Sequence, residues 1–101
     1  MPLVDRFAGT PQPTTHAEAV EHARDGVAIY WRPGCPFSGR LRVAVRKHND
    51  DIAWVNIWED DDGRAFVASV NDGNETVPTV VIDGVPHTNP APTLVLEALT
   101  R

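Results

Sequence analysis

A single cysteine, Cys35, is the side chain best suited to nucleophilic chemistry in this sequence. It follows a hydrophobic run, residues 27–31, that predicts a buried strand, and it precedes a helical pattern over residues 39–47. A thiol at such a turn lies beside a helix N-terminus, whose unpaired N–H groups and dipole favour the reactive thiolate. Because the chain has no second cysteine, Cys35 cannot form an internal disulfide, and any covalent partner must come from another molecule.

The neighbours of Cys35 favour an exposed turn over a buried, inert thiol. Gly34 and Pro36 flank it, and Pro36 suits the first turn of a helix, where its missing N–H would be unpaired anyway. Arg32 either stabilises the thiolate or is a solvated surface arginine. Ser38 either donates a hydrogen bond toward the sulfur or serves only as a first-turn residue.

Composition limits the classes of protein that the chain can represent. Its 101 residues and 42% apolar content suit one compact domain. A net charge of −5 argues against nucleic acid and acidic membranes as partners, and no apolar run approaches the roughly 20 residues of a membrane span. The start of the chain lacks the pattern of a signal peptide. Together with the lone cysteine, this predicts a cytoplasmic protein.

Periodicity and turn residues predict an α/β order of elements. After a loose arm, Thr14 or Thr15 caps a short helix with Glu18 in its first turn, and Gly26 ends it. Strands follow over residues 27–31, 52–58, 79–82 and 85–87, with helices over 39–47 and 63–70 between the first three. Asp83-Gly84 forms a tight hairpin, and Asn89-Pro90 caps and opens a last helix.

This order predicts one mixed sheet. The first two strands are parallel and joined by a crossover helix, the hairpin adds antiparallel strands, and helices cover both faces. We expect an N-terminal arm and short helix over residues 1–26 and the main domain over residues 27–101. Trp54 and Trp58 are expected to pack at the second strand, and Trp31 to border the site. The acidic run 59–62 reads as a helix start and a solvated face, with no metal site.

Two motifs resemble the glutaredoxin family of the thioredoxin fold. Cys35-Pro36-Phe37-Ser38 is similar to the Cys-Pro-Tyr-Cys/Ser site of that family, and Arg32 stands where glutaredoxins usually carry lysine. Thr76-Val77-Pro78 resembles the family's Thr-Val-Pro, whose proline is cis. The resemblance covers roughly residues 27 to 100, and it implies a four-stranded mixed sheet with helices on both faces. Residues 1–26 fall outside it and are expected to form an N-terminal helical extension.

One branch of that family, the actinobacterial mycoredoxins, is more similar still. Residues 70–80, followed by Thr88-Asn89-Pro90, carry this likeness. Common glutaredoxins have a Gly-Gly-x-Asp stretch at the latter place to hold the carboxylate of glutathione, so its absence favours mycothiol. Mycoredoxins mostly carry a second cysteine at the place of Ser38, so its absence here points to a monothiol route.

The resemblance implies a thiol-disulfide oxidoreductase that reduces mixed disulfides between client proteins and a low-molecular-weight thiol. Cys35 is the implied nucleophile, and the thiol, mycothiol or glutathione, is a co-substrate with no tightly bound cofactor and no metal. Arg32, Pro36, Phe37, Ser38, Val77, Pro78, Thr88 and Asn89 form the implied binding site. Within it, Phe37 lines a groove, the backbone of Val77 pairs with the substrate beside a cis Pro78, and Thr88 and Asn89 bind the polar end of the thiol.

Two other classes of protein stay open from the sequence. One is a carrier of a 2Fe-2S cluster held between two subunits, which the stiffening by Pro36 disfavours. The other is a thioredoxin-fold interaction module with a vestigial Cys35, which the co-occurrence of Arg32, Cys35 and residues 76–78 opposes. The leading prediction is a monomeric enzyme that acts on S-thiolated client proteins.

Overall fold

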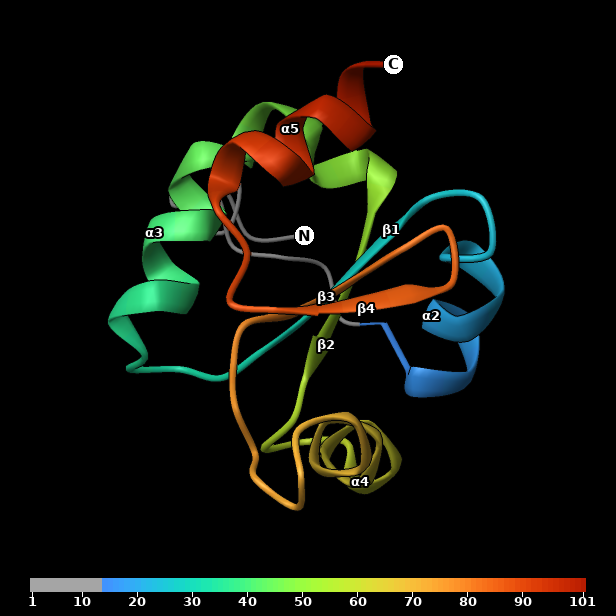
Figure 1. Ribbon diagram of the computed structural model, residues 1–101, viewed down its shortest axis with the longest axis vertical. Coiled ribbons are helices and arrows are strands. Elements are labelled where there is room, and N and C mark those ends of the chain that lie inside the picture. The colour runs from blue at the N-terminus through green and yellow to red at the C-terminus, as the bar shows by residue number, and fades with distance from the viewer. Residues whose placement is uncertain (1–13) are drawn as a thin grey trace, which may run out of the picture.

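The computed structural model describes residues 14–101, which form a four-stranded mixed sheet in the order β2-β1-β3-β4 (Figure 1). The strands are β1 (Val27–Trp31), β2 (Ile52–Asn56), β3 (Thr79–Ile82) and β4 (Val85–Thr88). β1 is parallel to β2 and antiparallel to β3, and β3 pairs with β4 as a hairpin. The predicted mixed sheet is confirmed.

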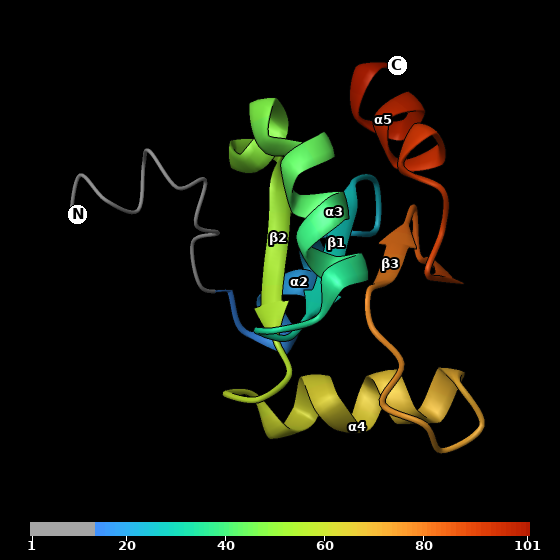
Figure 2. The same cartoon turned by 90° about the vertical axis from the view of Figure 1, so that its left-hand side faces the viewer.

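Helices cover both faces of this sheet. They are α2 (His16–His22), α3 (Pro36–Ala44), the 3₁₀ helix η1 (Arg46–Asp51), α4 (Asp61–Val70) and α5 (Pro92–Thr100). Side chains of β1 alternate between the faces, so Ile29 packs in a core with residues of α3 and α5, whereas Tyr30 packs in a core with residues of α2 and α4. α4 runs across the end of β2, below α3 in Figure 2.

The chain before β1 begins, in the described part, with a well-capped helix. Thr15 and Glu18 form a reciprocal capping box at the start of α2, and Ala19 and Ala23 are buried in the core under the sheet. The predicted arm lies outside the described residues except for Thr14, whose N–H donates to the carbonyl of Trp54 at 2.9 Å. The division at residue 26 stays a prediction.

Several predicted element boundaries are wrong. α2 ends at His22 with Ala23 as its C-cap, where the helix was expected to end at Gly26. The first crossover helix ends at Ala44, and a 3₁₀ helix continues to Asp51, where one helix to residue 47 was expected. β2 ends at Asn56 because the Asn56 side chain accepts a hydrogen bond from Trp58 N–H at 2.9 Å and turns the chain. Trp58 is consequently 59% exposed and does not pack at the strand as predicted, whereas Trp54 is buried.

The start of the last helix also differs from the prediction. α5 is capped by Ala91 with Pro92 in its first turn, so Asn89 is not its N-cap. Asn89 instead has a left-handed backbone, with φ of 45°, and its N–H donates to the carbonyl of Pro78 at 2.8 Å. The hairpin at Asp83-Gly84 is confirmed, with φ of 51° and 83°. Within residues 14–101 we find no helix with the length and apolar character to cross a membrane.

Candidate active site

Cys35 is the N-cap residue of α3, at the carboxyl end of β1. Gly34, with φ of 79°, turns the chain out of the strand, and Pro36 occupies the first helical turn. The helix opens with a hydrogen bond from Gly39 N–H to the carbonyl of Cys35 at 2.9 Å. The cysteine side chain makes no capping hydrogen bond, so the N–H groups of the first turn remain available to an anion.

The Cys35 side chain is more enclosed than the sequence predicted. Gly34 and Pro36 are exposed, as expected of a turn, but Cys35 itself is only 8% exposed and packs in the core that contains Ile57 and Val77. Its Sγ donates to the carbonyl of Val77 at 3.7 Å. The enclosure follows from the loop over residues 76–78, which lies against the thiol and which turn chemistry around Cys35 does not reveal.

The surroundings lower the pKa of Cys35. Burial raises the pKa, but this effect is outweighed by the hydroxyl and N–H of Ser38 and the N–H of Phe37, which are placed to donate to the ionised sulfur, and by the positive charge of Arg32. These donors belong to the first turn of α3. The site therefore favours the thiolate, which is the attacking form in thiol–disulfide exchange.

The hydroxyl of Ser38 is a buried donor beside Cys35. It has no hydrogen-bond partner within residues 14–101 as long as Cys35 directs its S–H to Val77. Once the thiol loses its proton, the sulfur becomes an acceptor toward which this hydroxyl can turn. A buried donor without a partner is costly, so the thiolate state relieves that cost.

Arg32 and Phe37 lie on either side of the thiol. Arg32 stacks on the ring of Trp58, with its guanidinium carbon 5.8 Å from the ring centroid, and Arg40 stacks on Phe37 at 5.9 Å. Phe37 is 51% exposed, as a residue that lines a groove would be, and Trp58 is similarly exposed. Sequence reasoning missed Trp58 because it assigned this residue to a strand. The signal that could have found it is Asn56, a turn-forming residue two positions earlier.

The loop that holds Val77 and Pro78 forms the opposite wall of the site. The Val77-Pro78 peptide bond is cis, which confirms the prediction. The Val77 carbonyl accepts a hydrogen bond from the Cys35 thiol. The N–H of Val77 donates to no group within residues 14–101. Thr79 fixes the far end of the loop, since its hydroxyl donates to the carbonyl of Thr76 at 2.7 Å.

Thr88 and Asn89 adjoin this loop rather than Cys35 directly. The hydroxyl of Thr88 donates to the side-chain oxygen of Asn71, whose amide nitrogen donates to Thr79 at 3.1 Å and to the carbonyl of Val67 at 2.8 Å. Asn71 therefore joins α4, β3 and β4 behind the loop. Sequence reasoning missed Asn71 because it belongs to a cluster of turn-forming residues, 71–74, which indicated only a turn.

A thioredoxin-like fold with an activated thiol at the first turn of α3 and a cis-proline loop against it defines the class of thiol-disulfide oxidoreductases. The glutaredoxin family profile matches residues 27–87. This chain belongs to the glutaredoxin family and is an enzyme of that class.

Individual relatives agree with this assignment. The chain is 37% identical over 65 residues to mycoredoxin 1 of Corynebacterium glutamicum, a match that covers 63% of this chain and 80% of that protein. It is 38% identical over 66 residues to a glutaredoxin-like protein of Mycobacterium tuberculosis, covering 64% and 79%. The crystal structure of a thioredoxin-like protein superimposes with a TM-score of 0.60 at 22% identity, covering 73% of this chain and 99% of that one, and supports the fold.

Proposed function

We propose that this protein reduces mixed disulfides between client proteins and mycothiol by a monothiol mechanism through Cys35. The observation that carries the proposal is the lone thiol at the N-terminus of α3, with its pKa lowered by Ser38, Phe37 and Arg32 despite its burial. A nucleophile with no second cysteine in the chain can accept the small thiol but cannot resolve the product internally.

The cycle has two exchange steps. The Cys35 thiolate attacks the small-thiol sulfur of the mixed disulfide, a new S–S bond joins Cys35 to the small thiol, and the client leaves as a thiolate. A second small-thiol molecule, as its thiolate, then attacks the small-thiol sulfur on Cys35 and releases the symmetrical disulfide with Cys35 as a thiolate. Overall, one client cysteine is released as a thiol and one free small thiol is oxidised. The symmetrical disulfide joins that thiol to the one that the client carried, so electrons balance.

Residues on both sides of Cys35 would bind the small thiol. The N–H of Val77, which has no hydrogen-bond partner among residues 14–101, suits pairing with a bound backbone or amide beside Pro78. Thr88 gives its proton to Asn71, so its oxygen is left as an acceptor for a donor on the thiol, with Asn89 alongside. Phe37, exposed after Pro36, supplies an apolar wall.

Two observations favour mycothiol over glutathione as the proposed small thiol. Thr88-Asn89-Pro90 replaces the Gly-Gly-x-Asp stretch with which common glutaredoxins hold glutathione, and one relative bears the name mycoredoxin 1. We further infer a monomer that acts in the cytoplasm, where thiols are kept reduced.

The test is turnover of one mixed disulfide under two reducing systems, one based on mycothiol and one on glutathione, with Cys35→Ser as the control. We expect turnover with mycothiol that is lost in the variant. Turnover with glutathione alone would contradict the choice of thiol and retain the chemistry. No turnover with either would contradict the enzyme mechanism and favour the cluster carrier.

A further inference from the structure

Basic residues are concentrated in the segment of the chain that contains Cys35, and the rest of the chain is acidic. Five cations and no carboxylate lie between residues 26 and 49, and the rest of the chain has four cations against fourteen carboxylates. These five are Arg32, Arg40, Arg42, Arg46 and Lys47. The ion pairs formed within residues 14–101 use other arginines, namely Arg24, Arg64 and Arg101, so the five cations are not neutralised there.

Three of these arginines are held by aromatic rings. Arg32 stacks on Trp58 at 5.8 Å, Arg40 on Phe37 at 5.9 Å and Arg42 on Trp31 at 5.6 Å, measured from the guanidinium carbon to the ring centroid. We call these six residues the arginine–aromatic surface. Each ring lies on one side of its guanidinium, and a guanidinium can still pair with a carboxylate in a planar, two-bonded contact through its remaining N–H donors. One N–H of Arg32 donates to the carbonyl of Pro33 at 3.3 Å.

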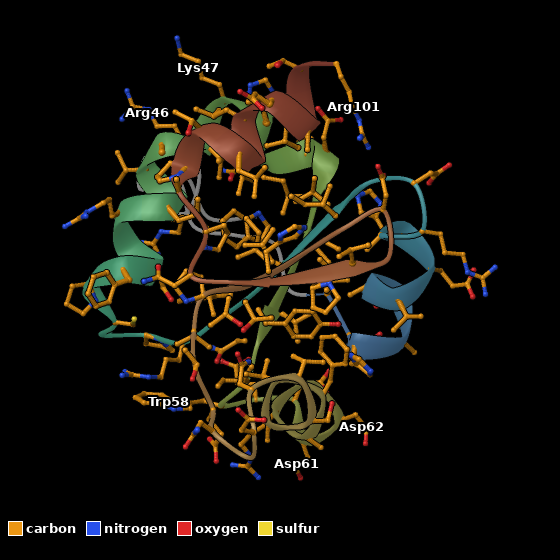
Figure 3. The ribbon with its side chains drawn as sticks, viewed as in Figure 1. Arg46, Lys47, Trp58, Asp61, Asp62 and Arg101 are labelled. Carbon is orange, nitrogen blue, oxygen red and sulfur yellow. The ribbon has the colours of Figure 1, made fainter. Side chains whose placement is uncertain are left out.

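The arginine–aromatic surface adjoins Cys35. Arg32 lies in the loop before the thiol and acts on it electrostatically, and Phe37 follows it in the first turn of α3. In Figure 3, α3 lies between Trp58 at one end and Arg46 and Lys47 at the other, whereas Asp61 and Asp62 project from α4. A client that brings a disulfide to Cys35 therefore meets Arg32 before the thiol and Arg40, which lies over Phe37, after it.

We propose that the arginine–aromatic surface binds the client protein and selects S-thiolated cysteines that lie in acidic segments. The inference rests on the proposed function and names the class of client for the same site. Charge complementarity gives a faster encounter with such clients and disfavours basic ones.

The chemistry of the leaving group works against acidic clients, and the arginines offset this disadvantage. Carboxylates beside a client cysteine raise the pKa of that cysteine, and a thiol of higher pKa leaves more slowly. As Cys35 forms its bond to the small-thiol sulfur, the client sulfur departs with the electron pair. Arginines that pair with the neighbouring carboxylates remove the repulsion that opposes this departure.

The test uses two peptides that carry the same small thiol on their cysteine and differ only in flanking Asp or Lys residues. Because both peptides carry the same small thiol, the charge of that thiol contributes equally to the two kcat/KM values and does not affect their ratio. We expect the acidic peptide to be preferred by about tenfold at low ionic strength, with the preference shrinking as salt is added.

Variants connect this preference to the arginine–aromatic surface. The double variant Arg40→Gln/Arg42→Gln should reduce the ratio toward one. Arg24→Gln, which removes one positive charge from the ion pair with Glu21, should retain the preference. Equal kcat/KM values for the two peptides, or an unchanged ratio in the double variant, would overturn the inference and leave the proposed function intact. Absence of turnover with both peptides would overturn both.

Discussion

The N-termini of α3 and α4 are built differently, although each helix follows a parallel strand of the same sheet. At α4, Asp60 accepts hydrogen bonds from Gly63 N–H at 2.8 Å and from His16 N–H at 2.9 Å. At α3, the same position holds Cys35, whose side chain caps nothing. One helix end is filled by a permanent charge, and the other is left open for a charge that forms when the thiol ionises.

The same physics acts on both acids. Burial raises the pKa of Asp60, but hydrogen bonds from the backbone of Gly63 and His16 outweigh it and hold the pKa below its ordinary value. Burial and first-turn donors oppose each other in the same way at Cys35. At α4 the result stabilises the fold, whereas at α3 it stabilises a nucleophile. The comparison shows that α3 lacks a permanent cap where the chemistry needs its donors.

The largest effect is expected from Cys35→Ser. Turnover of the mixed disulfide should fall to the uncatalysed background, because the chain contains no other thiol. The unfolding free energy should be unchanged or higher by up to about 1 kcal/mol, because serine is a favoured N-cap. Turnover assays and denaturant unfolding measure the two quantities. Activity in the variant would show that Cys35 is not the nucleophile.

Ser38→Ala should have the next largest effect. Loss of the hydroxyl removes a donor to the thiolate, so the pKa of Cys35 rises and less thiolate is present at neutral pH. We expect alkylation by iodoacetamide to slow by about tenfold at neutral pH, since hydrogen bonds to charged groups are worth roughly 1.5–3 kcal/mol.

The pH dependence separates this effect from a loss of structure. The variant's rate should approach that of the wild type at alkaline pH, where both thiols are ionised. A uniform decrease at every pH would contradict the assigned role of Ser38, and Ser69→Ala on α4 provides a matched control, since its hydroxyl bonds only within that helix.

Asp60→Ala should act on stability and leave the thiol unchanged. Loss of the cap should lower the unfolding free energy by about 1 kcal/mol. Because the pKa of Asp60 is depressed in the folded state, its contribution is present above the unfolded pKa and is lost as the pH falls through the folded pKa. The wild type and the variant should therefore converge in acid. Asp60→Asn, which retains a capping oxygen, should cost less.

Local chemistry in the sequence predicted several features correctly. Neighbouring residues predicted an N-cap at Thr14 or Thr15 with Glu18 in the first turn, the hairpin at Asp83-Gly84 and the first helical turn at Pro36, because a few adjacent residues decide each effect. The cis bond before Pro78 was predicted through the family resemblance, and propensity alone would not have given it.

The sequence-based predictions are wrong where two local signals compete, or where residues distant in the sequence determine the local structure. Asn89-Pro90 and Ala91-Pro92 both offer a proline for the first turn of α5, and the hydrogen bond from Asn89 N–H to Pro78 decides against the former. The enclosure of Cys35 depends on Val77, 42 residues away, which no pattern around the cysteine reports. The role of Asn71 likewise depends on Thr79 and Thr88, which the fold brings to it.

The first measurement to make is a pH titration of the thiolate ultraviolet absorbance of the native protein, with Cys35→Ser subtracted as the blank. We predict one ionisation with a midpoint below that of the same protein unfolded in denaturant, because Ser38, Phe37 and Arg32 outweigh burial. A midpoint at or above the unfolded value would mean that burial dominates, and Cys35 would then not be an activated nucleophile.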